Sequence, residues 1–455
     1  MHGLVFSHVP GFCQRLLIAF LLLGFSGCHI DAVEESASRR ATKDLVFEWN
    51  QLFLELERFT PGYRGPVTAR TYAYVGVAAW QAALPEMDGC LSLDERFPDF
   101  RNLPEAPRSF CLPASLNVAY AELLRQFFPM APAHLLEKLQ ALEARQAEAL
   151  RREAEPEAYR QSVTYGKRVA LAVWRWSMSD SLGHDGYLYN FDRQYQAPAC
   201  AGCWQPGGEH PMPALLPYWG GVRKFIAGTN AITVKTPVEF NANPGSPFYA
   251  EGMAVYSMSQ PLSKENRWIA EFWSDDVPGL TLSPAGRWIS IATQALEKAN
   301  APLPEVLETY LKLGLALSDA MVLCWQAKYR YTLERPEVYI RRGIDPQWKP
   351  LHDSPNFPTY PSGHSALGMA ASEVLTASLG AHFNLTDRTH EGRKEFAGQP
   401  RSFTSFEQMA LENAFSRLAL GVHFPMDCEE GIRIGRLIGQ QANALPLHTD
   451  EAALR

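Results

Sequence analysis

The sequence predicts an all-α protein built from helical bundles with long ordered loops. Apolar residues recur at three- and four-residue spacing in nine segments, and no comparable segment alternates apolar and polar residues as a half-buried strand does. The 455 residues are 46% hydrophobic and 20% charged, which is globular composition in a chain long enough for one large domain or several small ones. These observations exclude a disordered chain.

The first element is an apolar run, Leu16–Phe25, that follows Arg15 and precedes Ser26-Gly27-Cys28. A charged region, a short apolar core and small residues before a cysteine are typical of a bacterial lipoprotein signal. The run is about half as long as a membrane-spanning helix, which excludes a polytopic membrane enzyme. We therefore expect residues 1–27 to be removed and Cys28 to carry a lipid anchor facing the periplasm. His29 favours the outer membrane, and ordinary secretion is the alternative.

The rest of the chain divides by composition into three parts. Residues 28–65 predict a polar tether over Glu34–Lys43 and a first helix over Leu45–Phe59. Residues 66–260 predict an N-terminal helical half, which ends in a long ordered loop over Asp180–Gly252, rich in Gly, Pro and aromatic residues. Its helices are predicted at Ala69–Leu84, Ala114–Phe128, His134–Arg152 and Ala158–Met178. Residues 261–445 predict a C-terminal helical half, with helices at Pro284–Lys298, Pro304–Tyr329, His364–Leu379 and Phe406–Leu420.

Cysteine spacing leaves two disulfides open. An oxidising periplasm permits them, and Cys90 and Cys111 flank a proline-rich loop, while Cys200 and Cys203 can close a small ring or stay reduced. A zinc site at the latter pair needs a second pair of ligands, and no second C-x-x-C motif exists.

Two clusters of chemically active residues lie in the C-terminal half. Lys328 and Arg335 are seven residues apart, so we expect them on one face of one helix that Pro336 stops. In Pro361-Ser362-Gly363-His364, which precedes a helical run, Ser362 is expected at the N-cap. Gly363 then leaves backbone N–H groups open to an anion at the positive helix end, with His364 beside it.

A third cluster follows in the Phe406–Leu420 helix and just after it. Arg417 is expected in the last turn of this helix, and Gly421 and Pro425 place His423 on a turn. Asp427 can then hold the other ring nitrogen of His423. Three cations together with Ser and Gly donors are what a tetrahedral oxyanion such as phosphate or vanadate requires.

The three motifs are K-x6-R-P, P-S-G-H and S-R-x5-H-x3-D, and together they resemble the signature of vanadium-dependent haloperoxidases and type-2 phosphatidic acid phosphatases. Ala69–Leu84, Arg267–Asp275 and Ser318–Ala320 also look like bacterial members of the haloperoxidase family, so the resemblance covers roughly Ala69–Leu437. It implies a fold with two four-helix bundles.

The resemblance also implies a role for each motif residue. Vanadate would be the cofactor, with phosphate able to occupy the same site, and hydrogen peroxide and halide would be the substrates. His423 would be the apical ligand to vanadium, His364 the acid–base residue, and Lys328 would also polarise the peroxide. The equatorial oxygens would be held by Lys328, Arg335, Ser362, Gly363 and Arg417. Trp325 and Phe357 resemble the aromatic pair of the halide pocket.

Several alternatives stay open. An acid phosphatase or phosphatidic acid phosphatase would use the same residues on a phosphate ester, with His423 as nucleophile. A non-catalytic lipoprotein is disfavoured because every motif residue is intact. Asp319, nine residues before Lys328 on the same predicted helix, is a candidate partner of Arg417, and helical phase places it near but not on the Lys328 face. No spacing selects among His352, His382 and His390. A net charge of −7 without a block of like charge argues against nucleic acid as a partner. Halide preference and oligomeric state stay open.

Overall fold

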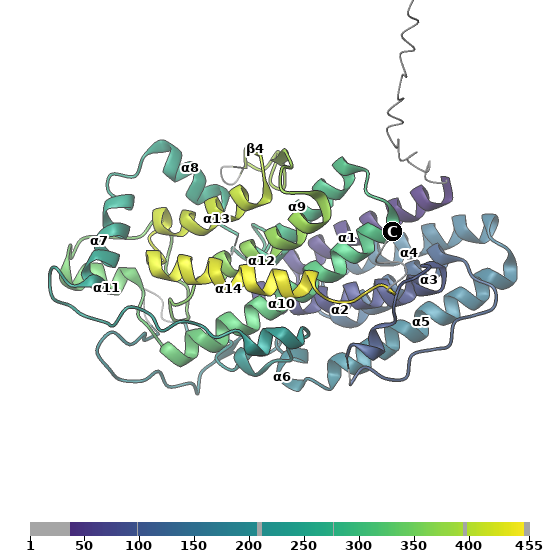
Figure 1. Ribbon diagram of the computed structural model, residues 1–455, viewed down its shortest axis with the longest axis horizontal. Coiled ribbons are helices and arrows are strands. Elements are labelled where there is room, and N and C mark those ends of the chain that lie inside the picture. The colour runs from purple at the N-terminus through teal and green to yellow at the C-terminus, as the bar shows by residue number, and fades with distance from the viewer. Residues whose placement is uncertain (1–36, 98, 207–211, 276, 395–397, 450–455) are drawn as a thin grey trace, which may run out of the picture. The chain divides into compact units, whose positions relative to one another are not determined.

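The computed structural model describes residues 37–97, 99–206, 212–275, 277–394 and 398–449. From Ala37 onwards the described chain forms one compact unit that is mostly helical (Figure 1). The first helices are α1 (Ala37–Phe59), α2 (Gly65–Ala83), α3 (Leu112–Phe127), α4 (Ala133–Glu153), α5 (Pro156–Met178) and α6 (Ser181–His184). The later helices are α7 (Pro247–Ser259), α8 (Lys264–Phe272), α9 (Pro284–Ala299), α10 (Leu303–Tyr331), α11 (Pro336–Gly343), α12 (Gly363–Leu379), α13 (Phe406–Leu420) and α14 (Pro425–Asn443). The all-α prediction is confirmed.

Short elements complete the fold. β1 (Phe191–Asp192) pairs antiparallel with β2 (Ala214–Leu215), and β3 (Leu385–Asp387) pairs antiparallel with β4 (Arg401–Phe403). Single 3₁₀ turns are η1 (Leu84–Glu86), η2 (Leu93–Glu95), η3 (Trp219–Gly221) and η4 (Ala227–Ala231). The stretch from residue 180 to the start of α7 at Pro247 is the predicted long loop, which ends before the expected Gly252 and carries α6, the β1–β2 pair and two of these turns.

Serine side chains begin several helices. Each accepts a hydrogen bond from the backbone N–H three residues further on, which satisfies one of the donors that a helix start leaves open. The serines are Ser246 before α7, Ser263 before α8, Ser283 before α9, Ser362 before α12 and Ser405 before α13. The N-cap predicted for Ser362 is confirmed.

Helix α12 is the centre of the C-terminal bundle and contacts α9, α10, α13 and α14 (Figure 1). Glycines allow α14 to approach it closely. A Cβ atom on Gly435 would lie 2.4 Å from the Ala366 carbonyl oxygen, and one on Gly431 would lie 2.7 Å from the Ser362 carbonyl oxygen. This close packing holds the N-terminal ends of α12 and α14 together.

Close approach at glycines also joins the predicted N-terminal and C-terminal halves, because α2 packs along α10. A Cβ atom on Gly314 would lie 2.9 Å from the Ala73 Cα atom, and one on Gly76 would lie 3.0 Å from the Leu311 Cα atom. The core therefore runs continuously from α2 into α10.

The nine predicted helices are confirmed, with ends shifted by a few residues. Helix α1, however, starts at Ala37, so the expected tether over Glu34–Lys43 is wrong for its second part. Lys43 is buried there and its ammonium donates to Asn300 Oδ1 and the Ala301 carbonyl, each at 3.0 Å. Helices α6, α7, α8, α11 and α14 were not predicted. Glycine lowers helix propensity, so Gly431, Gly435 and Gly439 hid the signal of α14.

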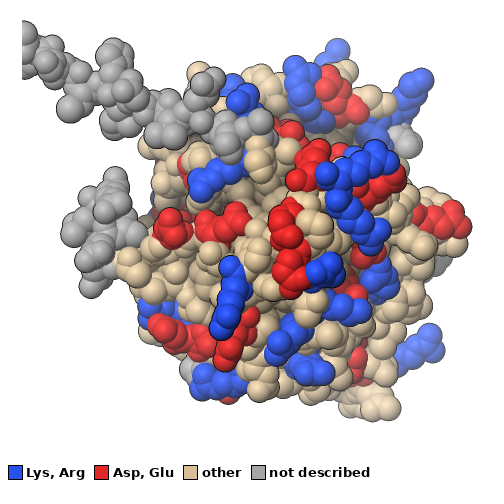
Figure 2. Space-filling view, turned by 90° about the vertical axis from the view of Figure 1, so that its right-hand side faces the viewer, with Lys and Arg blue, Asp and Glu red and all other residues tan. Residues whose placement is uncertain are grey.

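Some sequence predictions fall outside what the structure describes. The leader, Cys28 and residues 34–36 lie outside the described residues, and the division near residue 260 stays a prediction. No described helix is long and apolar enough to cross a membrane. On the face shown in Figure 2, acidic and basic side chains are interspersed rather than gathered by sign.

Candidate active site

The predicted site residues gather where helices end. Lys328 lies in the last turn of α10, Arg335 is the N-cap of α11, Ser362 is the N-cap of α12 and Arg417 lies in the last turn of α13. His423 lies between α13 and α14. All of these residues are at most 3% exposed. Segments far apart in sequence thus deliver cations and imidazoles to one buried place.

The path from Lys328 to Arg335 differs from the prediction. Helix α10 ends at Tyr331, because Thr332 adopts a left-handed conformation (φ 48°) and donates its N–H to the Lys328 carbonyl at 2.9 Å. Pro336 then begins α11 instead of stopping α10, as proline favours a first helical turn. The two cations therefore converge through a break between two helices, and the expectation of one shared helix face was wrong.

The ammonium group of Lys328 supports a loop. It donates to the carbonyl oxygens of Pro358 (3.0 Å), Thr359 (2.8 Å) and Pro361 (2.6 Å), which uses its three N–H donors. Burial lowers the pKa of Lys328, and nearby Arg335 lowers it further. Lys328 thus shapes the loop that leads into α12 and contributes its charge to the site.

Each arginine is held by backbone and turned toward an imidazole. Arg335 donates to the Phe357 carbonyl from Nε (3.0 Å) and to the Val422 carbonyl from Nη1 (2.7 Å). Its Nη1 also lies 3.2 Å from His423 Nε2. Because the guanidinium is a fixed fork of donors, these bonds fix its direction.

Arg417 is arranged in the same way around His364. Its Nη2 donates to the Trp273 carbonyl at 2.6 Å and its Nε donates to Ser416 Oγ at 3.1 Å. Its Nη1 lies 3.1 Å from His364 Nε2. Each imidazole therefore faces one guanidinium.

His423 is oriented from its other nitrogen, as predicted. Nδ1 lies 2.9 Å from Asp427 Oδ2 and 3.2 Å from Thr359 Oγ1, and the Thr359 hydroxyl also donates to Asp427 Oδ2. A nitrogen facing a carboxylate carries the proton, so Nε2 keeps its lone pair and accepts from Arg335. Asp427 also accepts the Phe424 N–H at 3.0 Å, which ties this orientation to the start of α14.

The electrostatics keep both imidazoles neutral. The pKa of His364 and that of His423 lie well below the ordinary value, chiefly because of burial and then because Arg335, Arg417 and Lys328 are close. Burial raises the pKa of Asp427, and the Thr359 hydroxyl and the nearby Lys328 oppose that rise. Positive charge dominates at the two imidazoles, as an anion site requires.

The start of α12 leaves room for a ligand. Gly363 lines a cavity of about 400 Å³ together with His364, Arg417 and His423. A Cβ atom on Gly363 would meet Met321 and Trp325 at 3.5 Å, an ordinary contact, so glycine is not required there by packing. The missing side chain instead leaves the backbone at a helix N-terminus accessible from the cavity.

Trp325 and Phe357 line the same cavity, as the aromatic-pair hypothesis requires. Their ring centroids are 5.0 Å apart, and Lys328 Nζ lies 5.0 Å from the centroid of Phe357. The indole N–H of Trp325 donates to the Leu215 carbonyl at 3.3 Å. The ring faces are thus fixed beside the cationic end of the cavity.

Sequence reasoning missed several residues here. Thr359 had no motif signal, because its role depends on the fold of the loop that Lys328 supports.

Of the three histidines left open, His352 lines the cavity and lies 3.3 Å from Ser274 Oγ, whereas His390 lies 3.3 Å from Asp275 Oδ1. The pairing of Asp319 with Arg417 was wrong. The Asp319 carboxylate accepts the backbone N–H groups of Phe225 (2.7 Å) and Ile226 (2.9 Å).

Comparison with known proteins identifies relatives of this fold. Residues 308–448 match the model of the VCPO second helical-bundle domain. The chain is similar to a bacterial vanadium-dependent iodoperoxidase, at 28% identity and a TM-score of 0.78, over 90% of this chain and 98% of that one. The chain has a vanadium haloperoxidase-like fold.

More distant structures share this haloperoxidase-like fold. A holo-type bacterial vanadium-dependent chloroperoxidase is similar at 18% identity and a TM-score of 0.67, over 85% of this chain and 92% of that one. An apo-type structure is similar at 18% identity and a TM-score of 0.63, over 84% and 95%. No curated protein matches.

Proposed function

We propose that this protein is a vanadate-dependent haloperoxidase that oxidises a halide ion with hydrogen peroxide. The observation that carries the proposal is the position of His423, whose imidazole lines the cavity together with His364 and Arg417 and whose Nε2 lies 3.2 Å from Arg335 Nη1. Vanadate needs a nitrogen ligand for its metal and cationic donors for its oxygens. The iodoperoxidase-like architecture supports the same reading.

Vanadate would be held by the residues that the motifs predicted. Its oxygens would contact Arg335, Ser362, Gly363 and Arg417, and its metal would bind His423 Nε2. Lys328, whose three N–H donors bond carbonyl oxygens in this structure, would contribute positive charge. Bound vanadate would supply Lewis-acid activation of peroxide. The donor set fits this group, since Gly363, His364, Arg417 and His423 line one cavity and Arg335 lies 3.2 Å from His423.

The protein's own residues would then handle protons and charge. Oxidation of halide by peroxide consumes one proton for each hypohalous acid and water formed. His364, neutral and 3.1 Å from Arg417, would carry that proton at Nε2. Asp427 and Thr359 would keep the proton of His423 on Nδ1. Trp325 and Phe357 would keep water from the halide side.

Halogenation of a 1,3-diketone tests the proposal. The chain from Ala32 onward, purified without phosphate, receives peroxide and iodide, bromide or chloride in separate assays, with and without orthovanadate. We expect turnover that depends on vanadate and is lost in His423→Ala, while the exposed-site control His382→Ala keeps it. We expect the enzyme to oxidise iodide, because the similar structure is that of an iodoperoxidase. Absence of halogenation with all three halides would contradict the proposal.

A phosphatase would use the same geometry, with His423 attacking phosphorus and His364 protonating the leaving alcohol. Parallel assays with p-nitrophenyl phosphate separate the two activities. Ester hydrolysis that vanadate inhibits, without any halogenation, assigns the site to the phosphatase.

We also propose that the protein is exported and anchored by Cys28. The Cys200–Cys203 disulfide supports export, because such bonds persist in oxidising compartments. Labelled fatty acid should enter the native chain, and Cys28→Ala should abolish the label and release the protein from the membrane fraction. Unchanged labelling of this variant would contradict the anchor.

A further inference from the structure

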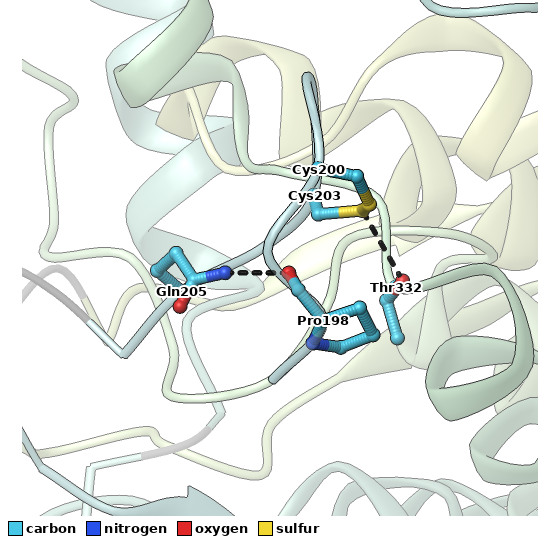
Figure 3. Close-up of a disulfide and its surroundings, with 5 residues drawn as sticks. All are labelled: Pro198, Cys200, Cys203, Gln205 and Thr332. Atoms are coloured by element: carbon cyan, nitrogen blue, oxygen red, sulfur yellow. Dashed lines mark hydrogen bonds between the residues drawn. A yellow bond between two sulfur atoms is a disulfide. The ribbon is translucent and has the colours of Figure 1, made fainter. Parts of the chain in front are cut away.

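The Cys200–Cys203 disulfide closes a four-residue ring in the long loop between β1 and β2 (Figure 3). Cys200 is exposed and Cys203 is partly exposed, so small thiols can reach the bond. Near the ring, Gln205 Nε2 donates to the Pro198 carbonyl at 2.7 Å and Trp204 is buried. No helix of the described chain includes the ring, so the disulfide is the covalent support of its shape.

The ring pairs with the break between α10 and α11. The Trp204 N–H donates to the Thr332 carbonyl at 2.6 Å, and the Glu334 N–H donates to the Gly202 carbonyl at 2.9 Å. The Thr332 hydroxyl also donates to Cys203 Sγ at 3.8 Å (Figure 3). These contacts end at the residue before Arg335.

The same break is bonded on its other side to the loop that orients His423. The Thr359 N–H donates to the Leu333 carbonyl at 2.9 Å. Residues 332–334 therefore lie between the disulfide ring and Thr359, whose hydroxyl contacts both His423 and Asp427. A short non-helical segment held from two sides in this way sets where the Arg335 side chain starts.

We infer that the Cys200–Cys203 ring is a positioning element of the oxyanion site, and that reducing its disulfide weakens anion binding through Arg335. The inference rests on the proposed function only in that the site binds an oxyanion. A dithiol reductant breaks the S–S bond, gives two electrons and two protons to form two thiols, and closes its own disulfide. In the other direction, one hydrogen peroxide oxidises the two thiols to the disulfide and yields two water molecules. The peroxide of the proposed reaction would thus restore the tight-binding form.

Calorimetry with orthophosphate tests the inference, because phosphate is not altered by the reductant. The dissociation constant is measured before and after dithiothreitol, with thiol titration to show that two more thiols have formed. We expect binding about tenfold weaker after reduction, or about 1.4 kcal/mol. The double variant Cys200→Ser/Cys203→Ser should bind weakly from the start and not respond to reductant. The matched control Cys90→Ser/Cys111→Ser changes two cysteines that form no disulfide, and should respond to the reductant as the native chain does.

A second comparison separates positioning from general loosening. Arg335→Ala should bind phosphate weakly, and reduction should not lower its phosphate affinity further. Arg417→Ala should still lose about tenfold in phosphate affinity on reduction. The reason is that the effects of groups that act together are not additive. Three results would overturn the inference. They are equal losses of phosphate affinity in both variants, a dissociation constant that complete reduction leaves unchanged, and a loss of affinity that comes with a loss of near-ultraviolet circular dichroism. Protein that binds phosphate with this redox dependence but never halogenates would refute the proposed peroxidase and leave the inference standing.

Discussion

At the residue scale, the site depends on neutral imidazoles kept beside cations. A protonated imidazole would have no lone pair for a metal or a proton, and burial next to Arg335 and Arg417 prevents that protonation. The geometry agrees, because each Nε2 atom lies within 3.2 Å of a guanidinium nitrogen. Burial, and after it the nearby arginines, thus lower the pKa of both imidazoles.

Asp427→Asn tests the orientation of His423. The amide removes the negative charge that holds the Nδ1 proton, so we expect vanadate affinity to fall about 10- to 100-fold, as is typical of groups that orient a metal-bound histidine. Halogenation rate against vanadate concentration measures the change. Glu429→Gln, an exposed change in the first turns of the same helix, is the control and should not alter it. Equal vanadate affinity in Asp427→Asn and the native chain would contradict the role of Asp427.

The depressed pKa values also predict proton uptake on anion binding. Burial lowers the pKa of Lys328 and that of His364, and a bound dianion raises both. Between the lowered and the raised pKa of each group, binding takes up a proton, so sulfate affinity should fall as pH rises, by up to about tenfold per pH unit for each proton. Calorimetry in two buffers of different ionisation enthalpy counts the protons. Sulfate is suitable because it does not titrate in this range, and proton release on binding would contradict the argument.

At the element scale, a buried carboxyl joins three helices. Glu57 of α1 accepts the Ser283 N–H at the start of α9 at 3.1 Å and the Thr68 hydroxyl of α2 at 3.2 Å. Burial raises its pKa to about 8. The same helix ends carry residues of the cavity wall, including Gly65 and Pro284, so this junction positions one side of the cavity.

Glu57→Gln should remove a pH dependence of stability. The folded pKa of about 8 lies above the unfolded value of 4.5, so the native chain loses stability as pH rises between these values, by about 1.4 kcal/mol per pH unit. Glutamine keeps the shape without ionising. We expect unfolding temperatures of native and variant protein to be similar at pH 5 and the variant to be higher at pH 8. A variant that is less stable than the native chain at pH 8 would contradict the buried neutral carboxyl.

At the scale of the whole molecule, the described end of the chain ties the two parts together. The Leu91 N–H donates to the Leu447 carbonyl and the Thr449 N–H to the Gly89 carbonyl, both at 2.8 Å. His448 Nε2 lies 2.7 Å from Glu308 Oε2 of α10. This segment therefore bridges the loop after α2 and α10, the long helix that carries Lys328 in its last turn.

Leu447→Ala should destabilise the whole fold without changing the site. Leu447 is 1% exposed, and removing such a buried side chain costs about 2–5 kcal/mol. Urea unfolding measures the change, with exposed Thr449→Ala as control. The vanadate affinity of the folded fraction should equal that of the native chain. A selective loss of vanadate affinity with native stability would contradict a purely structural role.

Much of the helical architecture follows from local pattern. The long amphipathic helices, such as α5 and α10, bury one face or nearly all of their length, and periodicity records that burial directly. Helix α14 was not predicted, because its glycines lower its helix signal and instead allow close packing against α12. That packing is a property of the pair of helices rather than of either one.

The sequence by itself determined the helical class and the chemistry of the candidate site, because residue types and short spacings carry helix periodicity and donor identity. The tertiary structure alone decided how the candidate residues meet: the break at Thr332 between Lys328 and Arg335, the part of Thr359 in orienting His423, and the pairing of the Cys200–Cys203 ring with the segment before Arg335. The physical reason is that these are contacts between segments distant in sequence. Such contacts form only when the helices that carry them pack, and no local pattern records them.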